Sequence, residues 1–123
     1  MCGIFGALTR LPDATLDRVS RSLAHRGPDA EGRFVEDGVS LLHRRLAILD
    51  LTEGGAQPWR SDDGNVVVVF NGEIYNHRLL QTELEKSGKR FRSRSDTESI
   101  VRGYQAWGEG VVERLDEMFA FAL

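Results

Sequence analysis

The residue best suited to covalent chemistry is Cys2, which follows the first methionine and precedes a glycine. Initiator methionine is commonly removed when the next side chain is small, and removal would place a thiol and a free α-amine on one residue. An α-amine has an ordinary pKa of about 8 and a thiol one of about 8.5, so the amine can take the thiol proton directly or through one water. Cys2 is therefore a candidate nucleophile that needs no histidine. The alternative is a small buried apolar residue, the commoner role of a lone cysteine.

A second candidate lies where the apolar run 66–70 gives way to Asn71 and Gly72. An oxyanion hole needs hydrogen-bond donors held rigidly where negative charge develops. The Asn71 side-chain amide and the Gly72 backbone N–H, at the end of a buried strand, would be such donors. The pair is predicted to end the strand abruptly. Asn-Gly is also the commonest hairpin signal, so a plain turn without a catalytic role is the alternative.

Charged residues could hold a free amino acid, whose carboxylate and ammonium need a cation and an anion at fixed separation. Arg45 precedes an apolar stretch and could bind a carboxylate through two parallel hydrogen bonds. Asp96 is expected at a helix start, where it could accept from an ammonium or simply complement the helix dipole. Arg44 is interpreted as a solvated surface charge.

The remaining polar residues favour structural roles. His25, His43 and His77 show no metal-ligand spacing and no second cysteine joins them, so no metal site is predicted. Arg26 and Asp29 are expected to form a pair that fixes the loop 25–32.

Periodicity predicts the elements that must position these residues. The first half should contain a strand over 2–8, a helix that ends before Gly27, paired strands at 34–35 and 39–42, an extended stretch over 45–51 and a loop over 52–58. The apolar run 66–70 predicts a strand buried on both faces.

The second half of the sequence predicts helices and a last strand. A helix over 76–87 should turn Leu79, Leu80 and Leu84 inward and end at Gly88. The run Ser95-Asp-Thr-Glu98 resembles a capping box that opens a helix to about residue 107. Val111, Val112, Leu115 and Met118 suggest one more short helix, and 118–123 has a strand pattern. This order predicts an α+β fold with two sheet layers and helices outside.

The bulk properties indicate one globular domain over residues 1–123. Hydrophobic residues make up 41% of the chain and charged residues 28%, with a net charge of -3. This balance argues against nucleic acid or an anionic membrane as the main partner. One cysteine permits no internal disulfide, and neither a signal peptide nor a membrane span is visible. We expect a soluble, cytoplasmic protein. The bare apolar strand at the end suggests a fragment that is incomplete at its C-terminus.

Seven short motifs in register resemble those of one enzyme family. They are Met1-Cys-Gly-Ile-Phe-Gly6, His25-Arg-Gly-Pro-Asp29, His43-Arg-Arg-Leu-Ala-Ile-Leu-Asp50, Gly55-Ala-Gln-Pro58, Asn71-Gly-Glu-Ile-Tyr-Asn76, Ser95-Asp-Thr-Glu98 and Met118-Phe-Ala-Phe-Ala122. The sequence resembles the class II glutamine amidotransferase domain of glutamine-hydrolysing asparagine synthetases along essentially its whole length. The run Asn71–Asn76 in particular differs from the Asn-Gly-Ile-Ile-Glu-Asn type expected of sugar-phosphate amidotransferases.

The resemblance implies an N-terminal-nucleophile hydrolase fold, an αββα sandwich, in which Cys2 attacks the glutamine side-chain amide and releases ammonia. By position, Asn71 and Gly72 resemble the oxyanion hole and Arg45 the residue that holds the glutamine carboxylate. Glu73 and Asp96 resemble the partners of the α-amino group. Backbone groups of Leu46, Ala47, Ile48 and Leu49 would line the same pocket.

The resemblance also implies partners that this sequence does not contain. The glutaminase step needs no cofactor, whereas ATP and Mg²⁺ are expected only in a synthetase domain that amidates aspartate. L-glutamine and that domain are the expected partners, and a homodimer is left open. Three alternatives stand beside this interpretation: an amidotransferase with another acceptor, a catalytically silent module, and a truncated fragment without a stable fold.

Overall fold

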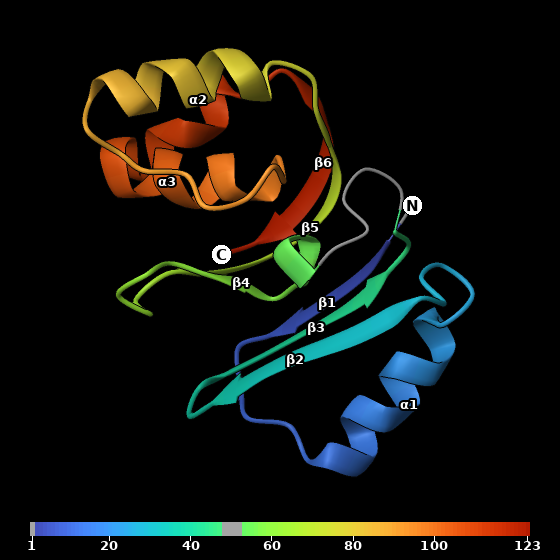
Figure 1. The fold of residues 1–123 in the computed structure, drawn as a ribbon. Coiled ribbons are helices and arrows are strands. Elements are labelled where there is room, and N and C mark those ends of the chain that lie inside the picture. The colour runs from blue at the N-terminus through green and yellow to red at the C-terminus, as the bar shows by residue number, and fades with distance from the viewer. Residues whose placement is uncertain (1, 48–52) are drawn as a thin grey trace.

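The computed structural model describes residues 2–47 and 53–123 of the 123-residue chain. Its helices and strands are labelled in Figure 1. In chain order they are β1 (Gly3–Ala7), α1 (Asp13–Leu23), β2 (Ala30–Glu36), β3 (Val39–Arg45), the 3₁₀ helix η1 (Glu53–Gly55), β4 (Trp59–Arg60), β5 (Val67–Ile74), α2 (His77–Lys86), α3 (Thr97–Trp107), the 3₁₀ helix η2 (Gly108–Arg114) and β6 (Glu117–Ala122).

The first sheet consists of β1, β3 and β2 in that order, with both pairs antiparallel. Helix α1 covers its outer face and buries Leu16 and Ser20 there. Close packing explains Gly3 in β1, because a Cβ atom at that position would lie 3.1 Å from the Cβ of Leu23 in α1.

The second sheet has the order β4, β5, β6 and is also antiparallel. Val68, Val69 and Phe70 in β5 are at most 3% exposed, which confirms that this strand is buried on both faces. Helices α2 and α3 cover the outer face, where Ile100 and Leu80 pack against β5 residues in the main hydrophobic core.

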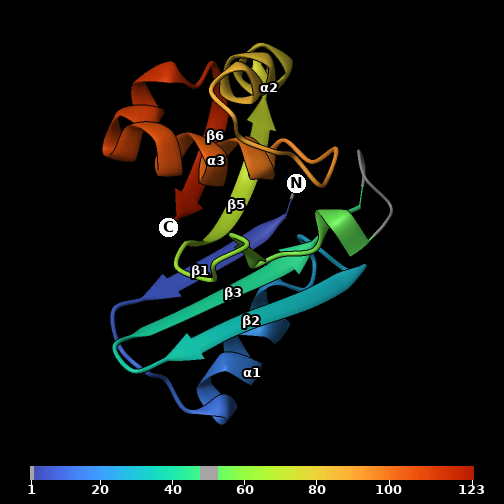
Figure 2. The ribbon, with the colours of Figure 1, turned by 60° about the vertical axis from the view of Figure 1, so that its left-hand side comes forward.

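The two sheets face each other, with α1 on one outer side and α2 and α3 on the other (Figures 1 and 2). A Cβ atom on Gly6 of β1 would lie 3.5 Å from the Cβ of Ala122 in β6, so the strands pack closely between the layers. The predicted α+β class and αββα layering are confirmed. No helix in the described ranges is long and apolar enough to cross a membrane.

Several sequence predictions for the elements are wrong in detail. Leu79, predicted to face inward, is 74% exposed, because Leu80 and Leu84 alone form the buried stripe of α2. Val112 is 46% exposed on η2, and Met118 belongs to β6 rather than to a helix. Strand β3 ends at Arg45, so Leu46 and Ala47 do not continue the extended stretch, and residues 48–51 lie outside the described part of the chain.

The predicted capping box is also only half formed. The Ser95 hydroxyl accepts from the Thr97 amide at 3.3 Å, but the Glu98 carboxylate does not return to the Ser95 amide. Glu98 is fully buried and accepts from the amides of Arg92 and Ser93 instead. Tertiary contacts therefore override the local motif at the start of α3.

Candidate active site

A cavity of about 410 Å³ opens among the N-terminal end of β1, the C-terminal end of β3, the middle of β5 and the start of α3. Seven of the residues singled out from the sequence line it. They are Cys2, Arg45, Leu46, Asn71, Gly72, Glu73 and Asp96. Cys2 and Asp96, which lie near opposite ends of the sequence, thus meet in one place.

The Cys2 thiol lies against the backbone of Leu46. The Leu46 amide donates to the Cys2 sulfur at 3.4 Å, and the sulfur lies 3.7 Å from the Leu46 carbonyl oxygen. Cys2 is free and only half-buried, unlike the inert buried cysteine of the alternative interpretation.

The two neighbouring arginines of β3 have different roles because successive side chains of a strand point to opposite faces. Arg45 lines the cavity. Arg44, predicted to be a solvated charge, is 16% exposed and faces α1; its Nε donates to the Gly27 carbonyl at 3.0 Å, and it pairs with Glu31 at 3.2 Å. Arg44 is therefore a structural residue that holds the loop after α1.

That loop is fixed differently from the predicted Arg26–Asp29 pair. No ion pair joins these two side chains, both of which lie in the described region. The Asp29 carboxylate instead accepts from the Ala47 amide at 2.8 Å, and the Asp29 amide donates to the Arg45 carbonyl at 3.0 Å. These bonds hold the chain on both sides of Leu46 and therefore fix the backbone that contacts Cys2.

The backbone groups predicted to line the pocket are only partly seen there. Leu46 lines the cavity, whereas Ala47 does not, because its amide is turned towards Asp29. Ile48 and Leu49 lie outside the described residues.

Asn71 and Gly72 do not end their strand, which corrects the predicted abrupt turn. Strand β5 continues to Ile74, with Asn71 opposite Ala120 and Gly72 opposite Phe119 of β6. A Cβ atom on Gly72 would lie 2.5 Å from the Met118 carbonyl oxygen, so the approach of β6 leaves no space for a side chain. The Asn-Gly pair is extended because a distant strand pairs with it.

The direction of the β5 amides leaves the Gly72 N–H facing away from β6. The Tyr75 amide donates to the Asp116 carbonyl at 2.9 Å, and amides alternate in direction along an antiparallel strand. The amides of Phe70, Gly72 and Ile74 therefore point to the other edge. Within the described ranges, no side chain accepts from the Gly72 N–H, which suits it to a ligand oxygen.

Asp96 lies at the Ile74 end of this row. Its side chain is 9% exposed and accepts from the Ile74 amide at 3.0 Å. Burial raises the pKa of the Asp96 carboxyl above its ordinary value and the negative charge of Glu73 acts in the same direction, while the Ile74 hydrogen bond opposes both. A ligand ammonium would favour the ionised carboxylate.

Other cavity residues were missed as site residues. His43 is 1% exposed, and burial lowers its pKa to about 4. Gln57 and Thr97 join the wall from the loop before β4 and from the start of α3. Both His43 and Gln57 lie in motifs noted in the sequence, which is the one signal that could have marked them. Within the described ranges, no group of three or more His, Cys, Asp or Glu residues could hold a metal ion.

Known proteins resemble this chain along its whole length. A family model described as a glutamine amidotransferase domain matches residues 1–123. The chain is 46% identical over 129 residues to asparagine synthetase (glutamine-hydrolyzing) 2 of Oryza sativa subsp. japonica, and 36% identical over 130 residues to asparagine synthetase (glutamine-hydrolyzing) 1 of Bacillus subtilis. Each match covers 100% of this chain but only 21% and 20% of the relative, so the chain spans about a fifth of their length.

A solved structure has the same fold. Glutamine phosphoribosylpyrophosphate amidotransferase from B. subtilis superposes with a TM-score of 0.78 at 21% sequence identity, covering 98% of this chain and 34% of that protein. At this identity the likeness concerns the fold alone.

Proposed function

Because this chain belongs to the glutamine amidotransferase domain family, we propose that it is the glutamine-hydrolysing half of an asparagine synthetase, with Cys2 as its nucleophile. The observation that carries the proposal is the meeting in one cavity of the Cys2 thiol, the Asn71–Gly72 backbone and the Asp96 carboxylate. Cys2 is held there by the Leu46 amide.

Removal of Met1 would expose the α-amine of Cys2, which then takes the thiol proton. The thiolate attacks the side-chain amide carbon of glutamine. The oxyanion that forms is stabilised by the Asn71 side-chain amide and by the Gly72 N–H. The amine returns its proton to the leaving nitrogen, so ammonia departs and a γ-glutamyl thioester remains. Water hydrolyses the thioester to glutamate and regenerates the thiol.

The ends of the substrate bind to opposite charges in the same cavity. The Arg45 guanidinium holds the α-carboxylate, and Glu73 and Asp96 hold the α-ammonium. Leu46 contributes backbone groups beside the reacting amide. Ile48 and Leu49 are proposed to line the pocket as well, through their backbone groups.

The ammonia acceptor is proposed from the relatives' names. We infer that the parent protein delivers ammonia to aspartate activated as β-aspartyl-AMP, with ATP and Mg²⁺ bound in a synthetase domain. The parent enzyme would work in the cytoplasm, and the pairing of two copies is an open part of the proposal.

A Cys2→Ala substitution in the full-length enzyme tests the nucleophile. Glutaminase activity should fall by at least about 10³-fold, since residues 1–123 contain no other thiol. Asparagine formation from free ammonia should persist, because the synthetase site does not use Cys2. Mass spectrometry of the mature enzyme should show Cys2 at its N-terminus. Glutaminase activity that survives the substitution, or an active enzyme that retains Met1, would contradict the mechanism.

A further inference from the structure

Three amides of β5 form a row along one edge of the strand, and side chains occupy both outer members. The Gln57 side-chain oxygen accepts from the Phe70 amide at 2.6 Å, and the Asp96 carboxylate accepts from the Ile74 amide at 3.0 Å. The Gly72 amide lies between them. The two acceptors therefore leave the Gly72 N–H, the proposed oxyanion donor, uncovered between them, and this N–H faces the cavity.

Gln57 also contacts the start of α3. Its side-chain nitrogen donates to the Thr97 hydroxyl at 3.3 Å, directly after Asp96. One planar amide thus links the strand that carries Gly72 to the helix start that carries Asp96. This link and the Asp96–Ile74 hydrogen bond together set the separation of these two parts of the cavity wall.

The backbone of Gln57 is fixed against the first sheet. A Cβ atom on Gly32 of β2 would lie 1.9 Å from the Gln57 carbonyl oxygen, so the two backbones are in direct contact. The first sheet also carries Cys2 at the start of β1. Gln57 therefore contacts three parts of the fold, namely the first sheet, which carries Cys2, strand β5 and helix α3.

We propose that Gln57 is a positioning residue for glutamine hydrolysis, which fixes the middle of β5 so that the Gly72 N–H meets the oxyanion formed at Cys2. This inference rests on the proposed function and extends it to a residue that holds no reacting atom. A misplacement of about 1 Å in a catalytic group can lower a rate by about 10²-fold. The loss should therefore appear in the chemical step rather than in binding.

Gln57→Met in the full-length enzyme removes both hydrogen bonds while keeping the side chain's length. The glutaminase kcat should fall about 10- to 100-fold, less than the loss of about 10²- to 10³-fold seen when an oxyanion donor is removed outright, because the Gly72 N–H is displaced and not deleted. The inhibition constant of glutamate, a ground-state ligand whose planar γ-carboxylate forms no tetrahedral intermediate, should change by less than about threefold. The rate of Cys2 alkylation by iodoacetamide should also stay within about threefold. A kcat near the wild-type value, or equal losses in all three measurements, would overturn the assignment.

Thr97→Val supplies a second, milder variant that removes only one of the two contacts. Its kcat should fall less than that of Gln57→Met, and the double variant should be no slower than Gln57→Met alone, because Thr97 acts through Gln57. Additive losses would contradict this coupling. If Gln57→Met does not fold, a lower kcat with unchanged glutamate inhibition in Thr97→Val still supports the proposal, and an unchanged kcat refutes it.

The matched control is Gln81→Met on α2, where the amide donates, among the residues that the structure describes, only to Glu85, four residues along. This variant should retain the wild-type kcat. Cys2→Ala distinguishes failure of the proposed function from failure of the role of Gln57. Glutaminase activity in Cys2→Ala refutes the proposed function, whereas a fully active Gln57→Met refutes only the role of Gln57.

Discussion

At the scale of single residues, burial governs the charge of two cavity side chains. His43 and Asp96 are almost inaccessible to solvent. Burial lowers the pKa of His43 and raises the pKa of Asp96, so it favours the neutral form of each side chain. A wall of this kind screens charge poorly, so a charged ligand group interacts strongly with whatever faces it. The arrangement suits a zwitterionic amino acid, whose two charges would meet Arg45 at one end and Asp96 at the other.

His43 gives a pH dependence of folding that can be tested. Its pKa is about 4 in the folded chain and about 6.5 when exposed, so the unfolded chain binds more protons between these values and stability falls as pH is lowered from 6.5 towards 4. The free energy of unfolding should drop by about 1 kcal/mol between pH 7 and 5.5, measured by urea denaturation. His43→Gln should remove most of this drop; an identical drop in the variant would show that other groups cause it.

At the scale of elements, the sequence predicts helices and buried strands well and strand continuity poorly. Helix α1 and strand β5 follow from apolar spacing, which depends on neighbouring residues. The strand through Asn71 and Gly72 does not, because it is set by pairing with Ala120 and Phe119 about 48 positions away. The long-range pairing with β6 therefore overrides the local preference of Asn-Gly for a turn. The same pairing directs the Gly72 amide towards the cavity.

Close contact between elements predicts a strong effect of Gly32→Ala. The new Cβ atom would meet the Gln57 carbonyl oxygen at 1.9 Å, so β2 or the loop before β4 must move. Forced overpacking of this kind costs about 1–3 kcal/mol, which thermal unfolding can detect. Gly110→Ala on η2 is the matched control, because its Cβ atom would meet nothing within 4 Å. Equal melting temperatures for the two variants would contradict the predicted contact.

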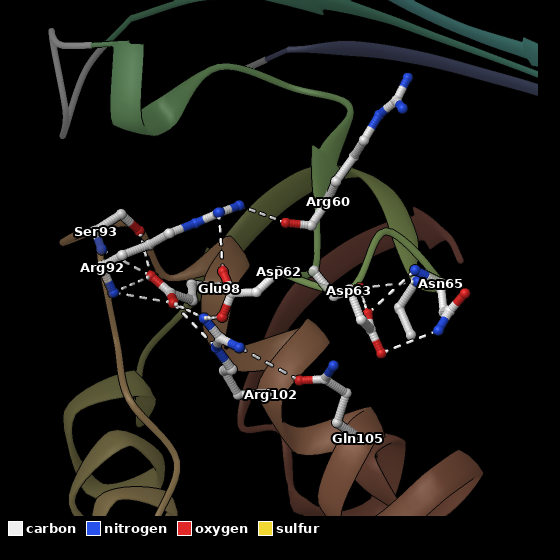
Figure 3. Close-up of polar contacts among 11 residues, drawn as sticks. Arg60, Asp62, Asp63, Asn65, Arg92, Ser93, Glu98, Arg102 and Gln105 are labelled. Carbon is white, nitrogen blue, oxygen red and sulfur yellow. Dashed lines mark hydrogen bonds and ion pairs between the residues drawn. The ribbon is translucent and has the colours of Figure 1, made fainter.

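At the scale of the whole molecule, a polar network ties α3 to the chain before it and to the β4–β5 turn (Figure 3). Glu98 pairs with Arg102 at 3.1 Å, and Arg102 pairs with Asp62 at 2.7 Å. Arg92 pairs with the same Asp62 at 2.9 Å and stacks over Trp59. Sequence spacing could suggest only the Glu98–Arg102 pair, four residues apart on one helix. The other partners are 30 or more positions away, so only the folded chain brings them together.

The centre of this network is Glu98, and its replacement should be more damaging than the loss of a surface charge. Glu98 is fully buried and also accepts from the Arg92 and Ser93 amides, which lead into the Asp96 segment of the cavity. Glu98→Gln places the new side-chain N–H group against the backbone N–H groups of Arg92 and Ser93. It also removes the carboxylate that pairs with Arg102. Removing one partner of a buried pair typically costs about 3–5 kcal/mol, and urea denaturation should give a loss in this range.

The control for Glu98→Gln is the same substitution at Glu83, whose pair with Arg114 at 2.8 Å is exposed on both sides. An exposed pair contributes at most about 1 kcal/mol, so Glu83→Gln should unfold almost as the wild type does. The contrast isolates burial, because the residue type, the partner type and the contact length are closely matched. Similar unfolding free energies for the two variants would mean that the network does not stabilise the start of α3. The position of Asp96 would then have to rest on its own hydrogen bond to Ile74 and on Gln57.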